Sequence, residues 1–62
     1  MTVSDFLKER NNRILERYRE LKALRIPAHE AKKQISLEFN NLSVATIEQV
    51  LYNRKYSNSP YN

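Results

Sequence analysis

The chain contains no glycine, and Pro27 and Pro60 are its only prolines. Glycine and proline are the residues that most often form tight turns and interrupt helices, so their scarcity favours helices joined by short connections. No stretch alternates polar and apolar residues for long enough to predict a strand. The sequence therefore predicts an all-α fold.

The length of the chain limits this fold to one domain. A chain of 62 residues buries only roughly 60% of the surface that it exposes when unfolded, which leaves little room for a catalytic pocket. Cysteine is absent, so neither a disulfide nor a thiolate metal site can support the core. We expect the domain to span residues 1–56, because the following residues, 57–62, are too polar to pack and should form a frayed tail.

The first predicted helix starts near Ser4 and Asp5, whose side-chain oxygens are suited to cap the free amides of a first turn. Pro27 ends this helix, because proline disfavours a helical residue before it, and it also suits the start of the next helix. Ile26 is expected to pack over that next helix. Apolar residues at helical spacing form one stripe along the first helix: Phe6, Leu7, Ile14, Leu15, Tyr18, Leu21 and Leu24.

Two shorter helices are predicted after Pro27, the second in AHEAKKQISLEFN and the third in VATIEQVLYNRK. Lys32, Lys33 and Glu38 are expected to face outward. Leu37 lies off the apolar stripe and is expected to contact the first helix or a partner. The inward-facing side chains are Ala28, Ala31, Ile35 and Phe39 in the second helix and Ile47, Val50 and Leu51 in the third. The three segments together predict a three-helix bundle.

The turn between the second and third helices contains the doublet Asn40 and Asn41. In one common way of joining two helices, the turn contains a glycine. The residues five positions and one position before this glycine are apolar, and the residue four positions before it is small. With Asn40 in the glycine position, those places hold Ile35, Phe39 and Ser36, which all fit. With Asn41 there, they would hold two polar residues and a bulky one, and buried unsatisfied polar groups cost about 1–3 kcal/mol each. We therefore predict that Asn40 replaces the glycine, because asparagine tolerates the left-handed region, and that Asn41 adds one residue to the turn.

In this register Leu42 is the apolar residue after the turn, and Ser43 caps the third helix. The segment from Arg17 to Lys55, about two-thirds of the chain, then resembles the helix-turn-helix domains of phage Mor-type activators, of sigma factor region 4 and of recombinases and transposases. The resemblance implies a small DNA-binding protein of bacterial, phage or mobile-element origin that acts as a transcription regulator. Its third helix would lie in the major groove.

The resemblance also implies which residues contact the DNA. Glutamine can pair with adenine, small apolar side chains can touch a thymine methyl group, and a carboxylate can accept from a cytosine amino group. The residues implied to contact bases are Val44, Ala45, Glu48, Gln49 and Tyr52. Those implied to contact phosphates, which fix the docking position without reading sequence, are Lys32, Lys33, Ser43, Thr46, Asn53, Arg54 and Lys55.

The charge of the chain fits an anionic partner such as double-stranded DNA. Eleven Lys and Arg against seven Asp and Glu give a net charge of +4. The third helix is only slightly positive, which predicts a modest affinity for DNA. A homodimer would raise this affinity by doubling the number of contacts with the DNA. The N-terminus lacks the apolar run of a secretory signal, and no segment is apolar enough to span a membrane, so we expect a cytoplasmic protein that does not bind a membrane.

Catalysis is not expected, nor is a cofactor, a metal or a small-molecule substrate. His29 is the single histidine, and no second imidazole or thiol supports it as a ligand or base. The main alternative to DNA binding is a helical module that binds a protein partner through the apolar stripe of the first helix. Salt separates the two functions, because DNA binding weakens steeply as salt rises and an apolar contact does not.

Overall fold

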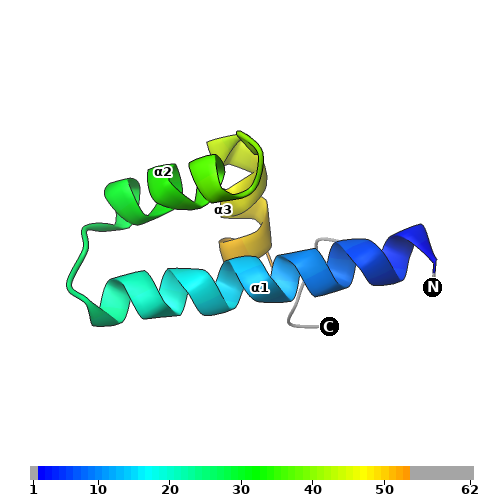
Figure 1. Cartoon of the computed structure of the whole chain (residues 1–62), viewed down its shortest axis with the longest axis horizontal. Coiled ribbons are helices and arrows are strands. Elements are labelled where there is room, and N and C mark those ends of the chain that lie inside the picture. Colours follow the sequence, from blue (N-terminus) through cyan, green and yellow to red (C-terminus); the bar gives the residue numbers. More distant parts are fainter. Residues whose placement is uncertain (1, 54–62) are drawn as a thin grey trace.

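The computed structural model describes residues 2–53, and in this range it consists of three helices (Figure 1). They are α1 (Val3–Ala23), α2 (Ala28–Glu38) and α3 (Val44–Tyr52). Each helix packs against the other two, which confirms the predicted all-α three-helix bundle. None of these helices combines the length and apolar character that a membrane span requires. The predicted tail, 57–62, lies outside the described residues.

Thr2 is the N-cap residue of α1. Of the two predicted capping residues, Asp5 takes part in the cap, and the prediction for Ser4 was wrong. The Thr2 hydroxyl accepts from the Asp5 N–H at 3.1 Å, and the Asp5 carboxylate accepts from the Thr2 N–H at 3.3 Å. This reciprocal arrangement is a capping box, which satisfies amides that have no partner within the helix. Asp5 therefore stabilises the first turn, and its negative charge also suits the positive end of the helix dipole.

The C-terminus of α1 is a Schellman motif around Arg25, whose φ is 64°. The Arg25 N–H donates to the Lys22 carbonyl at 2.9 Å, and the Ile26 N–H donates to the Leu21 carbonyl at 3.1 Å. Leu21 is buried and Ile26 packs against the core, which is the hydrophobic pairing that usually accompanies this motif. Pro27 follows directly as the N-cap residue of α2, so the chain reverses within four residues.

Replacing Arg25 with glycine should raise the free energy of unfolding by roughly 1 kcal/mol, because glycine adopts a left-handed conformation without the steric cost of a side chain. Arg25 is exposed, so little is lost with its side chain. Arg25→Ala is the matched control, because it removes the same side chain but keeps the backbone cost, and its stability should stay within about 0.5 kcal/mol of the wild type. Urea unfolding followed by circular dichroism measures both. Equal stabilities of the two variants would contradict the prediction.

The core lies where the three helices meet. Its buried members are Ile14, Leu15, Leu21, Ala31, Ile35, Ile47, Val50 and Leu51. Tyr18, Ile26, Phe39 and Leu42 are partly buried and pack against them. The inner faces predicted for the second and third helices are therefore confirmed, with Ala28 only half-buried.

The apolar stripe predicted for the first helix was wrong at its two ends. α1 has 21 residues and α2 has 11, and the N-terminal part of α1 extends beyond the other two helices (Figure 1). Phe6 is 60% exposed and Leu24 is 69% exposed. Leu37 is also mainly exposed, so it remains a surface residue of the described chain. Helical spacing thus identified the apolar face of α1 but not how much of it the shorter helices cover.

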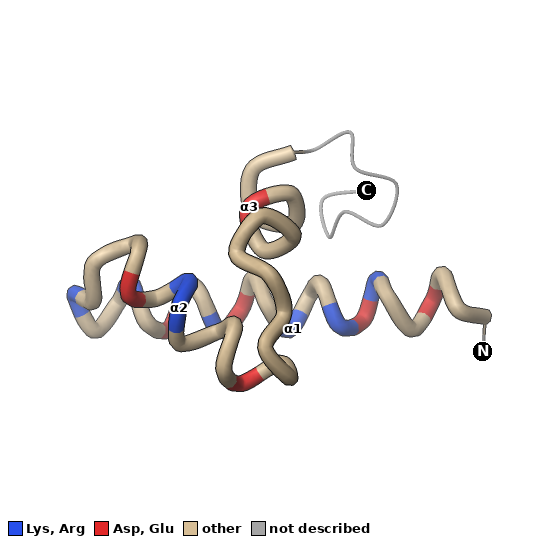
Figure 2. Tube along the Cα trace, turned by 90° about the horizontal axis from the view of Figure 1, so that it is seen from above, with Lys and Arg blue, Asp and Glu red and all other residues tan. Residues whose placement is uncertain are grey.

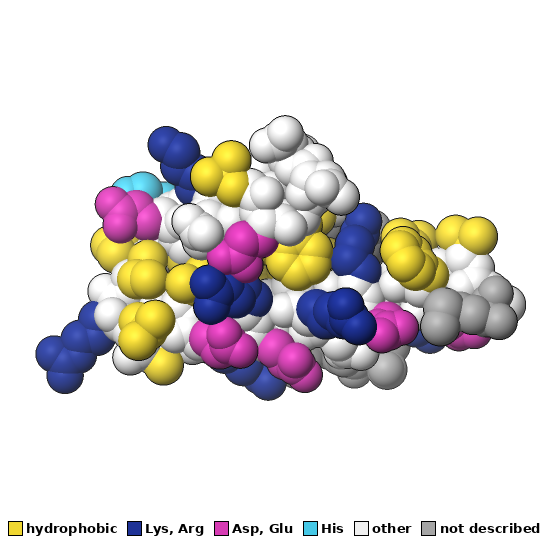
Figure 3. Space-filling model, in the orientation of Figure 1, with side chains coloured by type: hydrophobic (Ala, Val, Ile, Leu, Met, Phe, Trp, Pro, Cys, Tyr) yellow, Lys and Arg dark blue, Asp and Glu magenta, His cyan; other side chains and the backbone are white. Residues whose placement is uncertain are grey.

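Ionic hydrogen bonds connect α1 to the end of α2. Arg17 donates from Nε to Glu38 Oε1 at 2.9 Å, from Nη2 to Glu38 Oε2 at 2.9 Å, and from Nη1 to Glu20 at 3.0 Å. The bonds from Arg17, with a smaller contribution from Gln34, hold the pKa of the Glu38 carboxyl below its usual range. Charges of both signs are interspersed on this face (Figure 3). Because the pair is partly exposed, it orients the end of α2 more than it stabilises the fold.

Candidate nucleic-acid interface

The turn between α2 and α3 contains two consecutive left-handed residues, Asn40 and Asn41, each with a φ of 60°. The Phe39 N–H donates to the Ile35 carbonyl at 2.9 Å and closes α2. Ile35 is fully buried and Phe39 packs against the core, as the predicted register requires. The left-handed conformation of Asn40 is therefore confirmed. Asn41 adopts the same conformation, so the two asparagines reverse the chain together.

Ser43 caps α3, as predicted. Its hydroxyl oxygen accepts from the Thr46 N–H at 3.1 Å, and its hydroxyl group lies 3.2 Å from the Thr46 hydroxyl, to which it donates. The cap fixes the first turn of α3, because it satisfies one of the amides left free at a helix start. Ser43 is exposed and Thr46 is half-buried. The Ser43 hydroxyl hydrogen is thus engaged within the chain.

The two sides of α3 differ sharply in exposure. Ile47, Val50 and Leu51 are buried in the core. Val44, Ala45 and Gln49 lie exposed along the other side. The Gln49 side-chain oxygen accepts from the Asn53 amide at 2.7 Å, which limits the freedom of the glutamine while its own NH₂ group remains a donor. The structure therefore brings three of the predicted base-contacting residues onto one exposed face.

The other two predicted base-contacting residues, Glu48 and Tyr52, contact α1 and α2. Lys32 of α2 places its Nζ 3.4 Å from the Glu48 carboxylate and 4.9 Å from the centre of the Tyr52 ring. The Tyr52 hydroxyl lies 3.3 Å from the Tyr18 hydroxyl of α1. We call these four residues the interhelix cluster, because they connect all three helices on the surface.

The interhelix cluster changes the environment of its ionisable groups. Hydrogen bonding to the Tyr52 side chain, followed by attraction to the Glu48 carboxylate, raises the pKa of the Lys32 ammonium. Hydrogen bonding between the two phenols raises the pKa of Tyr18 and lowers that of Tyr52. Only 15% of the Lys32 side chain is exposed, so the prediction that Lys32 faces outward was wrong. Its charge is largely committed to α3 in the free protein.

The positive charge is unevenly distributed over the described residues. α3 carries no lysine or arginine and a single carboxylate, Glu48 (Figure 2). Among residues 2–53, the cations nearest to α3 in sequence are Lys32 and Lys33 of α2, and of these Lys33 is exposed. The predicted phosphate contacts Arg54 and Lys55 lie outside the described residues. The exposed face of α3 is thus nearly neutral, and a polyanion would have to be attracted by charges beside that face.

No metal-binding arrangement accompanies this surface. Within residues 2–53, no three side chains of the His, Asp or Glu type gather closely enough to hold an ion. His29 is exposed in the first turn of α2.

Comparisons of the chain with family models, with curated proteins and with solved structures gave no match. The resemblance to helix-turn-helix domains accordingly rests on the residues and their spacing.

Two contacts of this surface were not predicted from the sequence. The Lys32–Glu48 pair spans 16 positions and the Tyr18–Tyr52 pair spans 34. Local spacing does not report such pairs, because they depend on the angle at which the helices cross. The opposite charges on the second and third helices were visible in the sequence, but only the packing of α2 against α3 brings them together.

Proposed function

We propose that this chain binds double-stranded DNA in a sequence-specific way and acts as a small transcription regulator, with α3 in the major groove. The observation that carries the proposal is the two-sided character of α3, which is anchored by Ile47 and Val50 and exposed at Val44, Ala45 and Gln49. The Asn40–Asn41 turn and the Ser43 cap fix the first turn of α3, where Val44 and Ala45 are exposed, which supports insertion of that end first. The mechanism is occupancy of a DNA site, without chemistry.

Each part of the surface has a distinct role in this proposal. Gln49 donates and accepts at an adenine edge, while Val44 and Ala45 contact thymine methyl groups. Lys33, Thr46 and the Asn53 side chain contact phosphates, together with Arg54 and Lys55. Glu48 and Tyr52 follow Val44 at four-residue intervals on the same exposed side of α3, and their contacts with Lys32 connect α3 to α2.

A titration of fluorescent random-sequence duplexes tests the proposal directly. If Lys33, Arg54 and Lys55 each neutralise one phosphate, affinity should fall roughly fortyfold between about 50 and about 200 mM salt. The measurement is the slope of log K against log salt. Absence of binding by folded protein at the lowest salt would contradict the proposed function. Binding that is independent of salt would instead favour an apolar partner.

Glu48→Gln should strengthen DNA binding by roughly twofold to fivefold on all sequences, which corresponds to about 0.5–1 kcal/mol. The substitution removes a carboxylate beside the phosphates and releases Lys32 from the 3.4 Å pair that holds it. Glu16→Gln is the matched control, because it makes the same charge change on an exposed part of α1. Fluorescence anisotropy at fixed salt compares the two variants with the wild type.

Two outcomes separate this role of Glu48 from a base contact. In a Lys32→Gln background, the gain from Glu48→Gln should shrink, because no lysine remains to be released. A loss of affinity confined to duplexes with a particular cytosine would show instead that Glu48 reads that base.

A further inference from the structure

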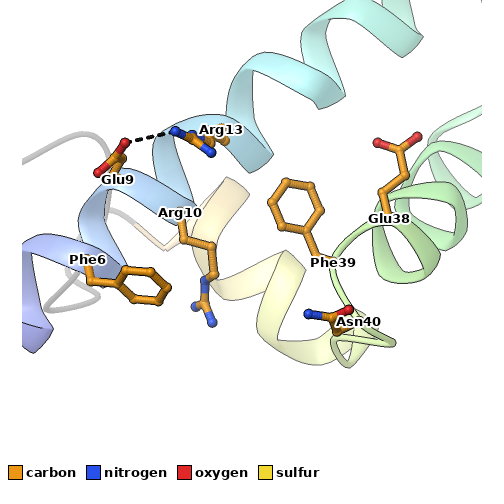
Figure 4. A pocket seen from close by; sticks show the side chains of 7 residues that line it. All are labelled: Phe6, Glu9, Arg10, Arg13, Glu38, Phe39 and Asn40. Atoms are coloured by element: carbon orange, nitrogen blue, oxygen red, sulfur yellow. Dashed lines mark hydrogen bonds and ion pairs between the residues drawn. The ribbon is translucent and has the colours of Figure 1, made fainter.

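A groove of about 510 Å³ lies between the N-terminal part of α1 and the turn that follows α2 (Figure 4). Phe6 and Phe39 lie on its two sides, and Arg10 is placed between them. Glu9 and Arg13 form its rim along α1. The groove therefore combines two aromatic rings with charges of both signs.

We infer that this groove binds a second copy of the chain, with the two α1 helices packed antiparallel about a two-fold axis. The axis passes between Glu9 and Arg10. Glu9 of each copy therefore faces Arg10 of the other copy. In the same register, Phe6 of each copy lies at the level of Arg13 in the other. Phe6 thus enters the groove of the second copy beside Phe39.

The apolar part of this interface is exposed in the single chain. Phe6 is 60% exposed and Val3, one turn before it, is 76% exposed. The ring of Phe6 projects from α1 on the same face as the groove (Figure 4). A two-fold interface uses the same face of both copies. A group that projects from this face in one copy must therefore meet a groove on the same face of the other copy. Burial of an exposed phenylalanine side chain stabilises an interface, and the symmetric pair makes this contribution twice.

The charges in the groove support a second copy over another occupant. The Glu9 carboxylate is paired with Arg13 at 2.9 Å in an exposed position. Arg10 donates from Nε and Nη2 to the Asn11 side-chain oxygen at 3.1 and 2.9 Å, and no carboxylate of residues 2–53 forms an ion pair with it. In the dimer, Glu9 of each copy supplies a carboxylate to Arg10 of the other copy, so the same ion pair forms twice. The face is thus complementary to itself in both its apolar and its charged groups.

Sedimentation equilibrium over a wide range of protein concentrations, without DNA, tests this inference independently of the proposed function. The wild type should form dimers, and Phe6→Ala should weaken the dimer at least tenfold. Leu24→Ala is the control, because Leu24 is a similarly exposed side chain, 69%, at the opposite end of the same helix. A wild type that stays monomeric, or equal effects of the two variants, would overturn the inference.

A charge exchange tests the register. Glu9→Arg alone and Arg10→Glu alone should each weaken the dimer, because like charges then face each other across the axis. The double variant, with Glu9→Arg and Arg10→Glu, restores opposite charges at both contacts and should recover dimerisation. If the double variant associates no better than the single variants, the proposed register is wrong. Thermal unfolding of each variant establishes that the bundle stays folded.

A fluorescent probe distinguishes the possible occupants of the groove. The chain contains no tryptophan, so Phe6→Trp introduces a single reporter. Its emission should shift to shorter wavelength as the protein concentration rises, since the indole enters the groove of a second copy. Emission that is already blue-shifted and independent of concentration would mean that the chain covers the groove itself, and it would overturn the inference.

Discussion

Replacing Ile47 with alanine should lower the free energy of unfolding by about 2–5 kcal/mol, the range seen when a large buried aliphatic side chain is removed. Ile47 is fully buried in the first half of α3, where the core side chains of all three helices meet. Small domains are only marginally stable, with total free energies of unfolding near the lower end of about 5–15 kcal/mol. The variant should therefore be largely unfolded at temperatures at which the wild type is folded.

Two further substitutions make this prediction specific. Ile47→Val removes a single methylene group and should cost only about 0.5–1.5 kcal/mol. Leu37→Ala removes as many carbon atoms as Ile47→Ala, but Leu37 is 63% exposed. Its substitution should therefore change the free energy of unfolding by no more than about 0.5 kcal/mol. Urea unfolding monitored by circular dichroism gives all three values. Similar losses for Ile47→Ala and Leu37→Ala would contradict the packing of α3 in the core.

The sequence predicted the helices and their buried faces because both depend on local spacing. Ala31 and Ile35 of α2, and Ile47 and Val50 of α3, recur at helical intervals, and a helix with such an apolar face must cover it to remain stable. The turn was also predictable, because only one alignment of the asparagine doublet kept Ile35 and Phe39 in the core. Asparagine is one of the few residues other than glycine that enters the left-handed region at modest cost. The φ of 60° at Asn40 therefore follows from chemistry that is visible in the sequence.

Contacts between different helices were less predictable. The stripe of α1 reaches from Phe6 to Leu24, yet both ends are exposed. The N-terminal part of α1 extends beyond α2 and α3 (Figure 1), and Leu24 is the C-cap residue, where the chain turns towards α2. Lys32 was expected in solvent, although packing places it between Glu48 and Tyr52. The left-handed Arg25 also gave no signal, because arginine is not a residue that marks such a position. In each case the missing information is the relative position of two helices or the path of a connection.

The interhelix cluster reduces the number of side chains that we expect to contact DNA bases. Glu48 and Tyr52 also contact Lys32 and Tyr18, so in the proposed complex we expect base contacts mainly from Val44, Ala45 and Gln49. Among these, Gln49 is the residue that can form two directional hydrogen bonds with one base. Sequence preference should therefore depend on Gln49 more than on any other described side chain, and its loss should have the largest effect on specificity.

Gln49→Ala should weaken binding to the preferred DNA site by roughly 1–3 kcal/mol and abolish the preference at one base pair. Binding to unrelated sequences should change little, because those complexes do not contain the paired hydrogen bonds. Alanine is a better helix former than glutamine, and Gln49 is exposed, so a loss of affinity could not be ascribed to unfolding. The measurement is a set of titrations on the preferred duplex, obtained by selection from random sequences, and on its single-base variants.

Lys33→Ala is the contrasting variant, because it removes an exposed cation from α2. It should weaken binding to every duplex by a similar factor and reduce the slope of log K against log salt by about 0.9, the share of one phosphate contact. Gln49→Ala should leave that slope unchanged. The pair of variants thus separates reading of bases from attraction to the backbone on the same protein. If both variants weakened all duplexes equally and lowered the slope equally, α3 would not be the helix that reads the sequence, even if the chain binds DNA.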